Sequence, residues 1–339
     1  MIRVAVDAMG GDRAPEAEVA GAVQALAVVP DDVQIQLVGR PSAIETELAR
    51  HPGADRSRLE IHEAADVIGM GEKPLAAVRR KPQSSLVVGL NRVKAGLADA
   101  FLSAGNTGAT LAASTVLLGL HEGVERATVA TLLPTGSSPV VMLDAGANLD
   151  CSARELVGFA YLGTVYMRDL LGIATPVVGL LNVGEEEEKG TAVVREAHQL
   201  LRQAPRIRYA GNIEGRDILP GPQQRTPIHV VVCDGFVGNI VLKFYESSAR
   251  VFVGLLRERI PDAFERPAMQ DLNRLLDYST YGGAPLLGVR GVSIICHGSS
   301  SPTAIKNGIG VAVRAVSADL SQHIATEFAT REPAAPVRP

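Results

Sequence analysis

Seven short aliphatic runs recur along the chain, and each ends in a polar residue that is followed closely by glycine. Runs of this length are typical of buried strands, and their alternation with longer helical patterns predicts βα units around a mostly parallel sheet. Ligands of such folds bind beyond the carboxyl ends of the strands. We therefore expect one large sheet whose strand edge carries a site. The seven runs are 2–6, 100–102, 140–143, 177–181, 207–210, 230–233 and 292–296.

The length and composition fit a globular protein that does not bind nucleic acid. The 339 residues carry a formal net charge of −4, and only 4% are aromatic, with no tryptophan. Few rings provide few stacking platforms for bases, and an acidic chain lacks a basic footprint. We expect a single large α/β/α domain over 1–330 and a disordered tail over 331–339, which is rich in proline and alanine.

The cysteine pattern and the N-terminus predict a cytoplasmic protein. Three cysteines without a CxxC pair indicate a reduced compartment and no structural zinc. Asp7 stands where the apolar core of an export signal would begin. The uncharged stretch 100–120 is polar and glycine-rich in its first half, which favours a buried helix over a membrane span.

A helical hairpin is predicted at about 245–277. Apolar residues cluster at 252–256, and basic and apolar residues follow through Arg266. One reading is a hairpin that packs in a dimer or in the core. The alternative is a tip, over 252–266, that touches a membrane or an acidic protein partner.

Familiar signatures of cofactor and metal chemistry are missing from the sequence. It contains no P-loop, no GxGxxG after the first strand, no HExxH and no GxSxG, and its seven histidines lack metal-ligand spacing. We therefore expect neither a cofactor nor a metal.

Several glycine-rich turns suit an anion instead. The turn 103–109 joins a strand to an apolar helix, so its free N–H groups and the helix dipole favour an anion. Asn106 in this turn either caps the helix or contacts the ligand. The turn 7–12 is a second glycine-rich segment, and Lys189 before Gly190 is a cation suited to clamp an anion. The basic stretch 79–85 is either a solvated face or a contact for phosphate or a carrier protein.

Nine blocks in order along the chain carry a resemblance to the bacterial phosphate acyltransferase family. These are DAMGGDRAP (7–15), KPLAAVRRKPQSS (73–85), SAGNTGA (103–109), LDAGAN (143–148), GLLNVGEEEEKG (179–190), GNIEGRD (211–217), VCDGFVGNIVLK (232–243), YGGAPLLG (281–288) and CHGSS (296–300). Ser301 departs from the family, which often has asparagine after the last block.

The resemblance implies an enzyme that makes long-chain acyl phosphate from inorganic phosphate and an acyl thioester of acyl carrier protein. It also implies an α/β/α fold similar to isopropylmalate dehydrogenases and phosphotransacetylases, a homodimer, and a membrane glycerol-3-phosphate acyltransferase that takes the product. An acidic carrier protein would need a local basic patch, for which 79–81 and 257–266 are the candidates.

This chemistry needs little acid or base. Phosphate is already an anion, and a thiol with a pKa of roughly 8.5 leaves readily, so we expect direct attack without an acyl-enzyme. Cys233 and Cys296 are expected to be buried packing residues, with Cys151 a weaker candidate nucleophile.

The candidate residues fall into two groups by role. The expected catalytic residues are Lys189, which neutralises charge, His297, which donates to the sulfur or the carbonyl oxygen, and Asp234 and Asn239, which position substrate. The expected phosphate or substrate contacts are Asp7, Gly10, Gly11, Ser103, Gly105, Asn106, Thr107, Asn148 and Asn212.

Three other functions compete with this assignment. A phosphotransacetylase acting on acyl-CoA would have the same anion site. A metal-dependent decarboxylating dehydrogenase is disfavoured because no acidic metal cluster is visible. A binding protein for an acyl or phosphate metabolite would need no turnover.

Overall fold

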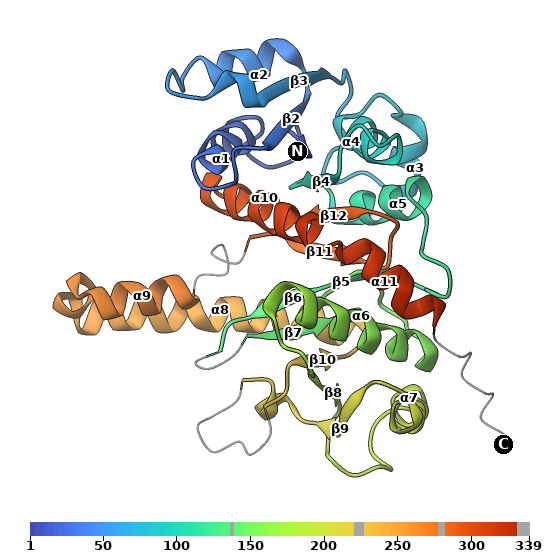
Figure 1. Ribbon diagram of the computed structural model, residues 1–339. Coiled ribbons are helices and arrows are strands. Elements are labelled where there is room, and N and C mark those ends of the chain that lie inside the picture. The colour runs from blue at the N-terminus through green and yellow to red at the C-terminus, as the bar shows by residue number, and fades with distance from the viewer. Residues whose placement is uncertain (136–138, 220–226, 277–281, 331–339) are drawn as a thin grey trace. The chain divides into compact units, whose positions relative to one another are not determined.

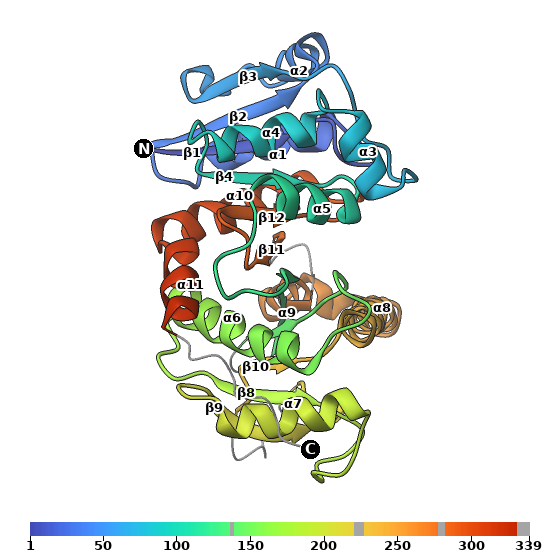
Figure 2. The same cartoon turned by 90° about the vertical axis from the view of Figure 1, so that its right-hand side faces the viewer.

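In the computed structural model, residues 1–135, 139–219, 227–276 and 282–330 are described, and they divide into two compact units (Figures 1 and 2). The first unit comprises residues 1–120 and 278–321, and the second comprises 121–277 and 322–339. Both contain strands covered by helices, so the predicted α/β class is confirmed. The prediction of one domain over 1–330 stays a prediction, and the predicted tail at 331–339 lies outside the described residues.

The first unit is a mostly parallel sheet between two helical layers. Its strands follow the order β3-β2-β1-β4-β12-β11, and only β11 runs antiparallel to its neighbour β12. Helices α1, α2 and α10 cover one face and α3, α4 and α5 the other (Figure 1). The strands are β1 (Ile2–Asp7), β2 (Val33–Gly39), β3 (Leu59–Glu63), β4 (Ala100–Ser103), β11 (Ala284–Leu287) and β12 (Val292–Ile295). The helices are α1 (Glu16–Leu26), α2 (Pro41–Leu48), η1 (Arg56–Arg58), α3 (Pro74–Arg80), α4 (Ser85–Lys94), α5 (Thr107–Leu117) and α10 (Pro302–Ser317).

The second unit has its own sheet, in the order β6-β7-β10-β8-β9, in which only β6 is antiparallel to its neighbour. Its strands are β5 (Thr128–Val129), which stands outside this order, β6 (Thr131–Leu133), β7 (Val140–Leu143), β8 (Val177–Leu181), β9 (Arg208–Ile213) and β10 (Val230–Val232). Its helices are α6 (Ala153–Leu171), α7 (Ala192–Gln203), η2 (Gly215–Asp217), α8 (Gly235–Arg259), η3 (Pro261–Glu265) and α9 (Pro267–Leu276). Helix α11 (Leu320–Ala329) belongs to this unit from Gln322 onward.

All seven predicted strands exist, but the expectation that they line one edge of one sheet was wrong. Three of them, β1, β4 and β12, lie in the first unit, while β7, β8, β9 and β10 lie in the second. Each set is parallel within its own sheet, so each unit has a strand edge of its own.

The predicted hairpin is an arm built from α8, η3 and α9, which extends beyond the sheet of its own unit (Figure 1). It begins earlier than expected because Asp234 accepts a hydrogen bond from the backbone N–H of Val237 and so caps α8 ten residues before the predicted start. No helix among the described residues is both long enough and apolar enough to cross a membrane.

Candidate functional site

The predicted site residues divide between the two strand edges. The edge of the first unit brings together Asp7, Gly10, Gly11, Ser103, Gly105, Asn106 and Thr107, with His297 on the neighbouring turn after β12. The edge of the second unit carries Asn148, Lys189 and Asp234 on the turns after β7, β8 and β10, Asn212 near the end of β9, and Asn239 near the start of α8.

Asp7 ties the first unit's turns together from a buried position. Its carboxylate accepts hydrogen bonds from the Ser103 hydroxyl at 2.7 Å and from the backbone N–H of Met9 at 3.2 Å, and it also bonds to Ser85 at the start of α4. Burial raises the pKa of Asp7, while these hydrogen bonds oppose that rise. Asp7 therefore acts as the anchor of three segments.

Two glycines let the turns after β1 and β4 meet. A Cβ on Gly10 would collide with the Asp7 carboxylate and reach the backbone nitrogen of Gly105. The Gly105 N–H in turn donates to the Ser103 hydroxyl at 3.0 Å. The two glycine-rich turns predicted from the sequence are thus in direct contact.

Asn106 is occupied by structural bonds. Its Oδ1 accepts from the backbone N–H of Ala109 at 3.0 Å and so caps α5, while its Nδ2 donates to the carbonyls of Met70 at 2.8 Å and Glu72 at 3.2 Å. The capping alternative therefore describes its side chain. Thr107 is exposed at the first position of α5, at the positive end of the helix dipole.

His297 is exposed on the turn after β12 and has a defined tautomer. Its Nδ1 accepts from the backbone N–H of Ser299 at 3.3 Å and lies 2.8 Å from the Ser299 hydroxyl. Because a backbone N–H can only donate, the neutral ring carries its proton on Nε2. This nitrogen is then a hydrogen-bond donor, as the predicted role requires.

The Lys189 loop of the second unit is fixed by two asparagines. Asn182 donates to the Lys189 carbonyl at 3.1 Å, and Asn212 donates to the Glu186 carbonyl at 3.0 Å. Gly190 has a φ of 88° and lies so close to Asn182 that a Cβ would collide with its Oδ1. The predicted substrate contact Asn212 thus supports the loop through its amide nitrogen, while its buried Oδ1 has no hydrogen-bond partner.

The acidic run before Lys189 is paired with arginines rather than with the lysine. Glu185 bonds to Arg216 at 3.4 Å and Glu187 to Arg202 at 2.5 Å. Lys189 is exposed, and no ion pair to its ammonium exists among the described residues. The loop backbone is therefore held in place, and the exposed Lys189 ammonium is engaged by no ion pair among the described residues.

Asp144, which sequence reasoning did not single out, organises the turn after β7. It is buried and accepts from the backbone N–H groups of Val129, Ala147 and Asn148 and from the Asn148 amide. Burial raises the pKa of Asp144 against these bonds. Its signal in the sequence is its place, the first polar residue after an apolar strand.

Of the remaining predicted contacts in this unit, only Asn239 presents an exposed side chain. Asn148 is buried, and its amide nitrogen donates to the Ala127 carbonyl and to the Asp144 carboxylate. Asp234 caps α8. Asn239 lies on the first turn of α8 next to Gly146, and no described group hydrogen-bonds to its amide.

The three thiols are poor nucleophiles. Burial is the largest cause in each case, and it raises the pKa of Cys151 and of Cys296 to about 12 and that of Cys233 well above its usual value. The thiolate is the reactive form, so these side chains are suited to packing.

A second missed residue is Glu18 on α1. Its side chain is 1% exposed, and its Oε2 has no hydrogen-bond partner. Its signal is an acid inside the small, apolar run AEVAGAV, where an amphipathic helix would place an apolar residue.

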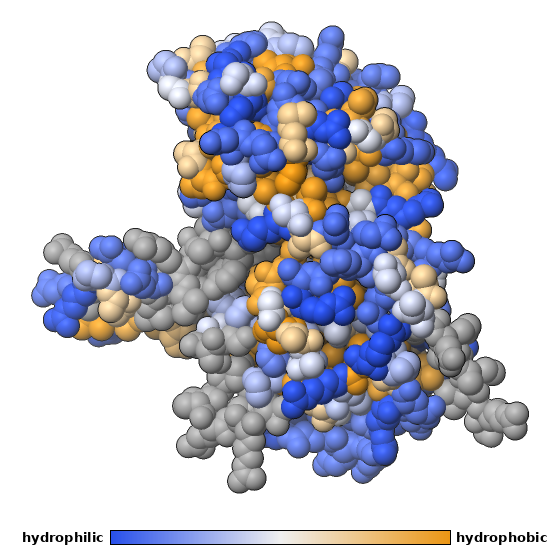
Figure 3. Space-filling view, viewed as in Figure 1, coloured by the Kyte–Doolittle hydropathy of each residue, from blue (hydrophilic) through white to orange (hydrophobic). Residues whose placement is uncertain are grey.

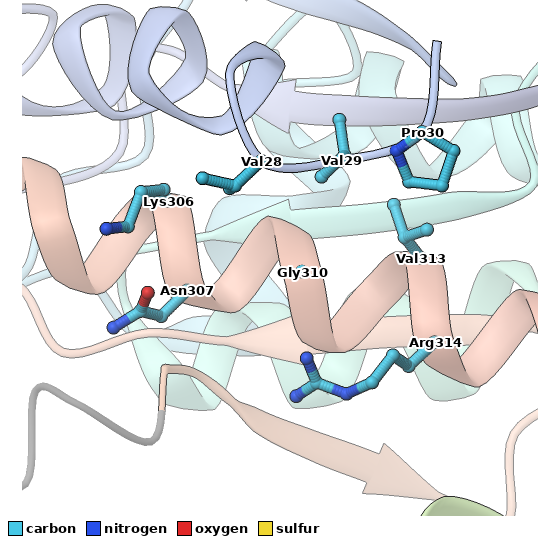
Figure 4. Close-up of a pocket in the computed structure, with 8 residues that line it drawn as sticks. All are labelled: Val28, Val29, Pro30, Lys306, Asn307, Gly310, Val313 and Arg314. Carbon is cyan, nitrogen blue, oxygen red and sulfur yellow. The ribbon is translucent and has the colours of Figure 1, made fainter. Parts of the chain in front are cut away.

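A pocket of about 310 Å³ lies elsewhere in the first unit, between the segment that follows α1 and the face of α10 (Figure 4). It is lined by Val28, Val29, Pro30, Lys306, Asn307, Gly310, Val313 and Arg314. None of the predicted site residues lines it. Among the described residues no group of three or more His, Cys, Asp or Glu side chains could hold a metal ion.

Known sequences similar to this one are phosphate acyltransferases. A family model described as fatty acid synthesis protein matches residues 2–323. A phosphate acyltransferase of Heliobacterium modesticaldum is 45% identical, over 95% of this chain and 98% of the relative. A phosphate acyltransferase of Geobacter sp. strain M21 is 46% identical, over 91% of this chain and 87% of the relative.

The similar solved structures share the fold at low sequence identity. A phosphotransacetylase from Streptococcus pyogenes has a TM-score of 0.61 and 16% identity, covering 93% of this chain and 94% of that one. A branched-chain phosphotransacylase from Enterococcus faecalis has a TM-score of 0.60 and 14% identity, covering 93% and 99%. The predicted likeness to phosphotransacetylase folds is confirmed.

Proposed function

The chain belongs to the phosphate acyltransferase family, and we propose that it transfers a long-chain acyl group from acyl carrier protein to inorganic phosphate. The protein is an acyltransferase of lipid synthesis; the carrier-protein donor and the acyl phosphate product are the proposal. The observation that carries it is 45% identity over 95% of the chain to a phosphate acyltransferase. The product would be consumed by a membrane glycerol-3-phosphate acyltransferase, as the first step toward phosphatidic acid.

In the proposed reaction a phosphate oxygen attacks the carbonyl carbon of the thioester. The new C–O bond forms, the carbonyl oxygen becomes an oxyanion, and collapse of this intermediate breaks the C–S bond. The leaving sulfur takes up the proton that the attacking hydrogen phosphate ion carried, directly or through water, and departs as the carrier-protein thiol. The protein has to hold the phosphate against the carbonyl and stabilise the oxyanion, which charged groups and oriented donors accomplish.

The exposed groups at the two strand edges are suited to these tasks. In the first unit, Thr107 and the turns of Gly10, Gly11 and Gly105 would contact phosphate, and the Nε2–H of His297 would donate a hydrogen bond to the departing sulfur or the carbonyl oxygen. Ser103, Asn106 and Asp7 would act through the backbone that they hold.

The second unit would supply a cation and an amide. Lys189 would neutralise charge, and Asn239 would donate to the substrate. Asn148, Asp234 and Asn212 would shape the loops that carry these groups.

Direct attack by phosphate is supported by the state of the candidate nucleophiles. The thiols have raised pKa values. The Ser299 hydroxyl is close to His297, but among the described residues no third group hydrogen-bonds to the other nitrogen of the His297 ring, as a catalytic triad would require. No acyl adduct should therefore appear on the protein in intact-mass spectra during turnover.

The proposal is tested by incubating the purified protein with palmitoyl-carrier protein and phosphate and trapping acyl phosphate with hydroxylamine. Phosphate-dependent hydroxamate is the expected result. Its absence would contradict the proposal that acyl carrier protein is the acyl donor. Activity with palmitoyl-CoA alone would favour the phosphotransacetylase alternative, because a phosphotransacetylase has a similar fold. Binding of acyl phosphate without turnover would favour a metabolite-binding protein, and dependence on NAD would favour a dehydrogenase.

A basic surface for the acidic carrier protein is better offered by the arm than by the stretch 79–81. Glu72 pairs with Lys81 at 2.6 Å and with Arg80 at 3.4 Å, which leaves only Arg79 uncompensated there. On the arm, Arg257 stacks over the Phe264 ring at 5.1 Å, and Arg259 and Arg266 are exposed. We therefore favour the end of the arm as the docking surface.

We further propose that a second copy of the chain covers the apolar side of α8. Phe236, Ile240, Phe244, Val251 and Leu255 are exposed there, and their spacing places them within about 100° on one face of the helix. Apolar side chains are visible along one side of the arm (Figure 3). Peripheral contact of a cytoplasmic protein with a membrane through 252–266 is the competing use of this surface.

A further inference from the structure

The carboxyl group of Glu18 lies directly under the turn that is proposed to contact phosphate. A Cβ on Gly11 would collide with Glu18 Oε1, and the same Cβ would lie 3.6 Å from Ala104 on the neighbouring turn. The side chain is 1% exposed, and its Oε2 makes no hydrogen bond. A buried carboxyl with an unsatisfied oxygen is therefore aimed at the junction of the two glycine-rich turns.

Apart from a hydrogen bond with its own backbone, the surroundings of Glu18 provide little to stabilise a negative charge. Asp7 on β1 and Asp12 on the turn add negative charge near it, and the buried thiol of Cys296 faces it from the end of β12. Arg13 is the cation that acts on it among the described residues, and its guanidinium donates to the Ser300 carbonyl at 3.3 Å. No ion pair to Glu18 exists among the described residues.

We propose that Glu18 is a positioning residue that must be uncharged for an anion to bind at the Gly10–Gly11 turn. A charged carboxylate under the turn would repel a phosphate in a site of low dielectric constant, where charges interact more strongly than in water. An uncharged carboxyl removes this repulsion. The inference rests on the proposed function, because it assumes that the Gly10–Gly11 turn contacts phosphate.

The titration of Glu18 agrees with this geometry. Burial, with Asp7 as a smaller cause, raises the pKa of Glu18 to about 8, so the group is mostly neutral at pH 7. Anion binding and protonation of Glu18 are then linked, and each favours the other. Affinity for the anion should fall as the pH rises through the pKa.

The test measures sulfate binding by calorimetry, because sulfate is a tetrahedral dianion that does not itself titrate in this range. With a pKa of about 8 the neutral fraction of Glu18 at about pH 9.5 is about 3%, so the dissociation constant of the wild type should rise about thirtyfold above its value at about pH 6.5. Glu18→Gln is the uncharged variant of nearly the same shape, and its affinity should stay within about threefold over the same range. Glu16→Gln removes an exposed acid from the same helix and should keep the wild-type profile.

Each outcome separates this inference from the proposed function. A wild-type profile without the fall, or the same fall in Glu18→Gln, overturns the role of Glu18 even if the enzyme makes acyl phosphate. The wild-type profile decides the matter alone if the variant does not fold. If sulfate does not bind at any pH and phosphate does not compete, the anion site of the proposed function is misplaced. Expressed as the concentration of the phosphate dianion, the KM for phosphate should follow the same profile as the sulfate constant, with kcat changing less.

Discussion

Most polar side chains at the two strand edges are used to hold backbone rather than to face solvent. Ser103, Asn106, Asn148 and Asp234 each hydrogen-bond to a neighbouring turn or helix end. Such bonds keep the glycine-rich turns in one conformation, which is a condition for binding a small anion without reorganisation. We therefore expect the chemistry to be carried by the few exposed groups at these edges, which are Thr107, Lys189, Asn239 and His297.

The first prediction concerns Lys189. Because its ammonium is exposed and unpaired, Lys189→Ala should lower kcat/KM by about 10²-fold to 10³-fold, as expected when a preorganised charge-stabilising group is lost. The melting temperature should not change, since no described contact of the side chain is lost. Initial rates of hydroxamate formation and a thermal melt measure both effects. Arg202→Ala, a cation of the same surface that pairs with Glu187, is the control and should keep near wild-type rates.

The second prediction concerns the stability cost of Glu18. Its pKa of about 8 in the folded protein lies above the usual 4.5, so between these values the folded state holds a proton that the unfolded state has lost. The free energy of unfolding should therefore fall with rising pH by about 1.4 kcal/mol per pH unit in this window, and should not change further above it.

Replacing Glu18 with Gln removes this slope. The stability advantage of the variant over the wild type should grow by at most about 4 kcal/mol between about pH 5 and about pH 8. Urea unfolding curves at the two pH values measure it, and an advantage that is equal at both would contradict the burial of a neutral acid. Glu16→Gln should show no such growth.

The sequence predicted that the candidate residues lie at strand ends. It did not predict which of their side chains are exposed and which hydrogen-bond to the backbone. Asn and Asp that end a strand serve equally well as helix caps and as ligand contacts. Asn106 and Asp234 turned out to be caps, and nothing in their local sequence separates the two uses. Glu18 was missed because its environment includes Cys296 and the turn of Ala104, which are distant from it along the chain.

At the scale of elements, α8 differs from the other helices by its apolar exposure. Of its 25 residues, the buried ones are Gly235, Gly238, Leu242 and Ala249 among those described. Phe244 is 71% exposed, and the other members of its apolar face are exposed as well. Large exposed apolar faces mark interfaces. This exposed face is the observation on which the proposed dimer rests.

The third prediction is that Phe244→Asp together with Leu255→Asp converts a dimer into a monomer. A charge in the centre of an apolar interface leaves an unpaired buried carboxylate, which costs several kcal/mol of association free energy. Light scattering after gel filtration should give the mass of one chain, 35.6 kDa, in place of twice that mass.

Two controls distinguish the possible uses of this face. Val116→Asp alters an exposed apolar residue on α5 and should leave the mass unchanged. The second control replaces Leu255 and Leu256 together with Asp. If this variant stays dimeric but no longer sediments with anionic liposomes, the face binds lipid instead.

Periodicity predicted the existence of the main strands and helices, but it did not predict how the strands group. The runs 100–102 and 292–296 are far apart in sequence, yet β4 and β12 pair side by side, while β7 and β10 pair in the other sheet. Chain order does not encode sheet order when other strands and helices are inserted between the two partners. Strands β2 and β3 were not predicted, because the turns after them lack the pattern of a polar residue followed by glycine that marked the others.

At the scale of the whole chain, neither unit is continuous in sequence. The chain enters the second unit at His121, returns to the first at Tyr278, and enters the second again at Gln322. The last crossing brings α11 onto α6. Glu327 pairs with Arg168 and Arg206, and the Phe328 ring packs edge-on against Tyr161 at 6.1 Å.

The fourth prediction follows from this return of the chain. The family model ends at residue 323, but Ile324 and Phe328 beyond it are buried, at 2% and 4% exposure, so they belong to the core of the second unit. Truncation after Ser321 should therefore destabilise that unit strongly, and Phe328→Ala alone should cost about 3 to 5 kcal/mol of unfolding free energy. Truncation after Thr330 is the control and should leave the urea midpoint unchanged. If Phe328→Ala also left it unchanged, the second unit would fold without α11, and the last crossing of the chain would serve something other than its stability.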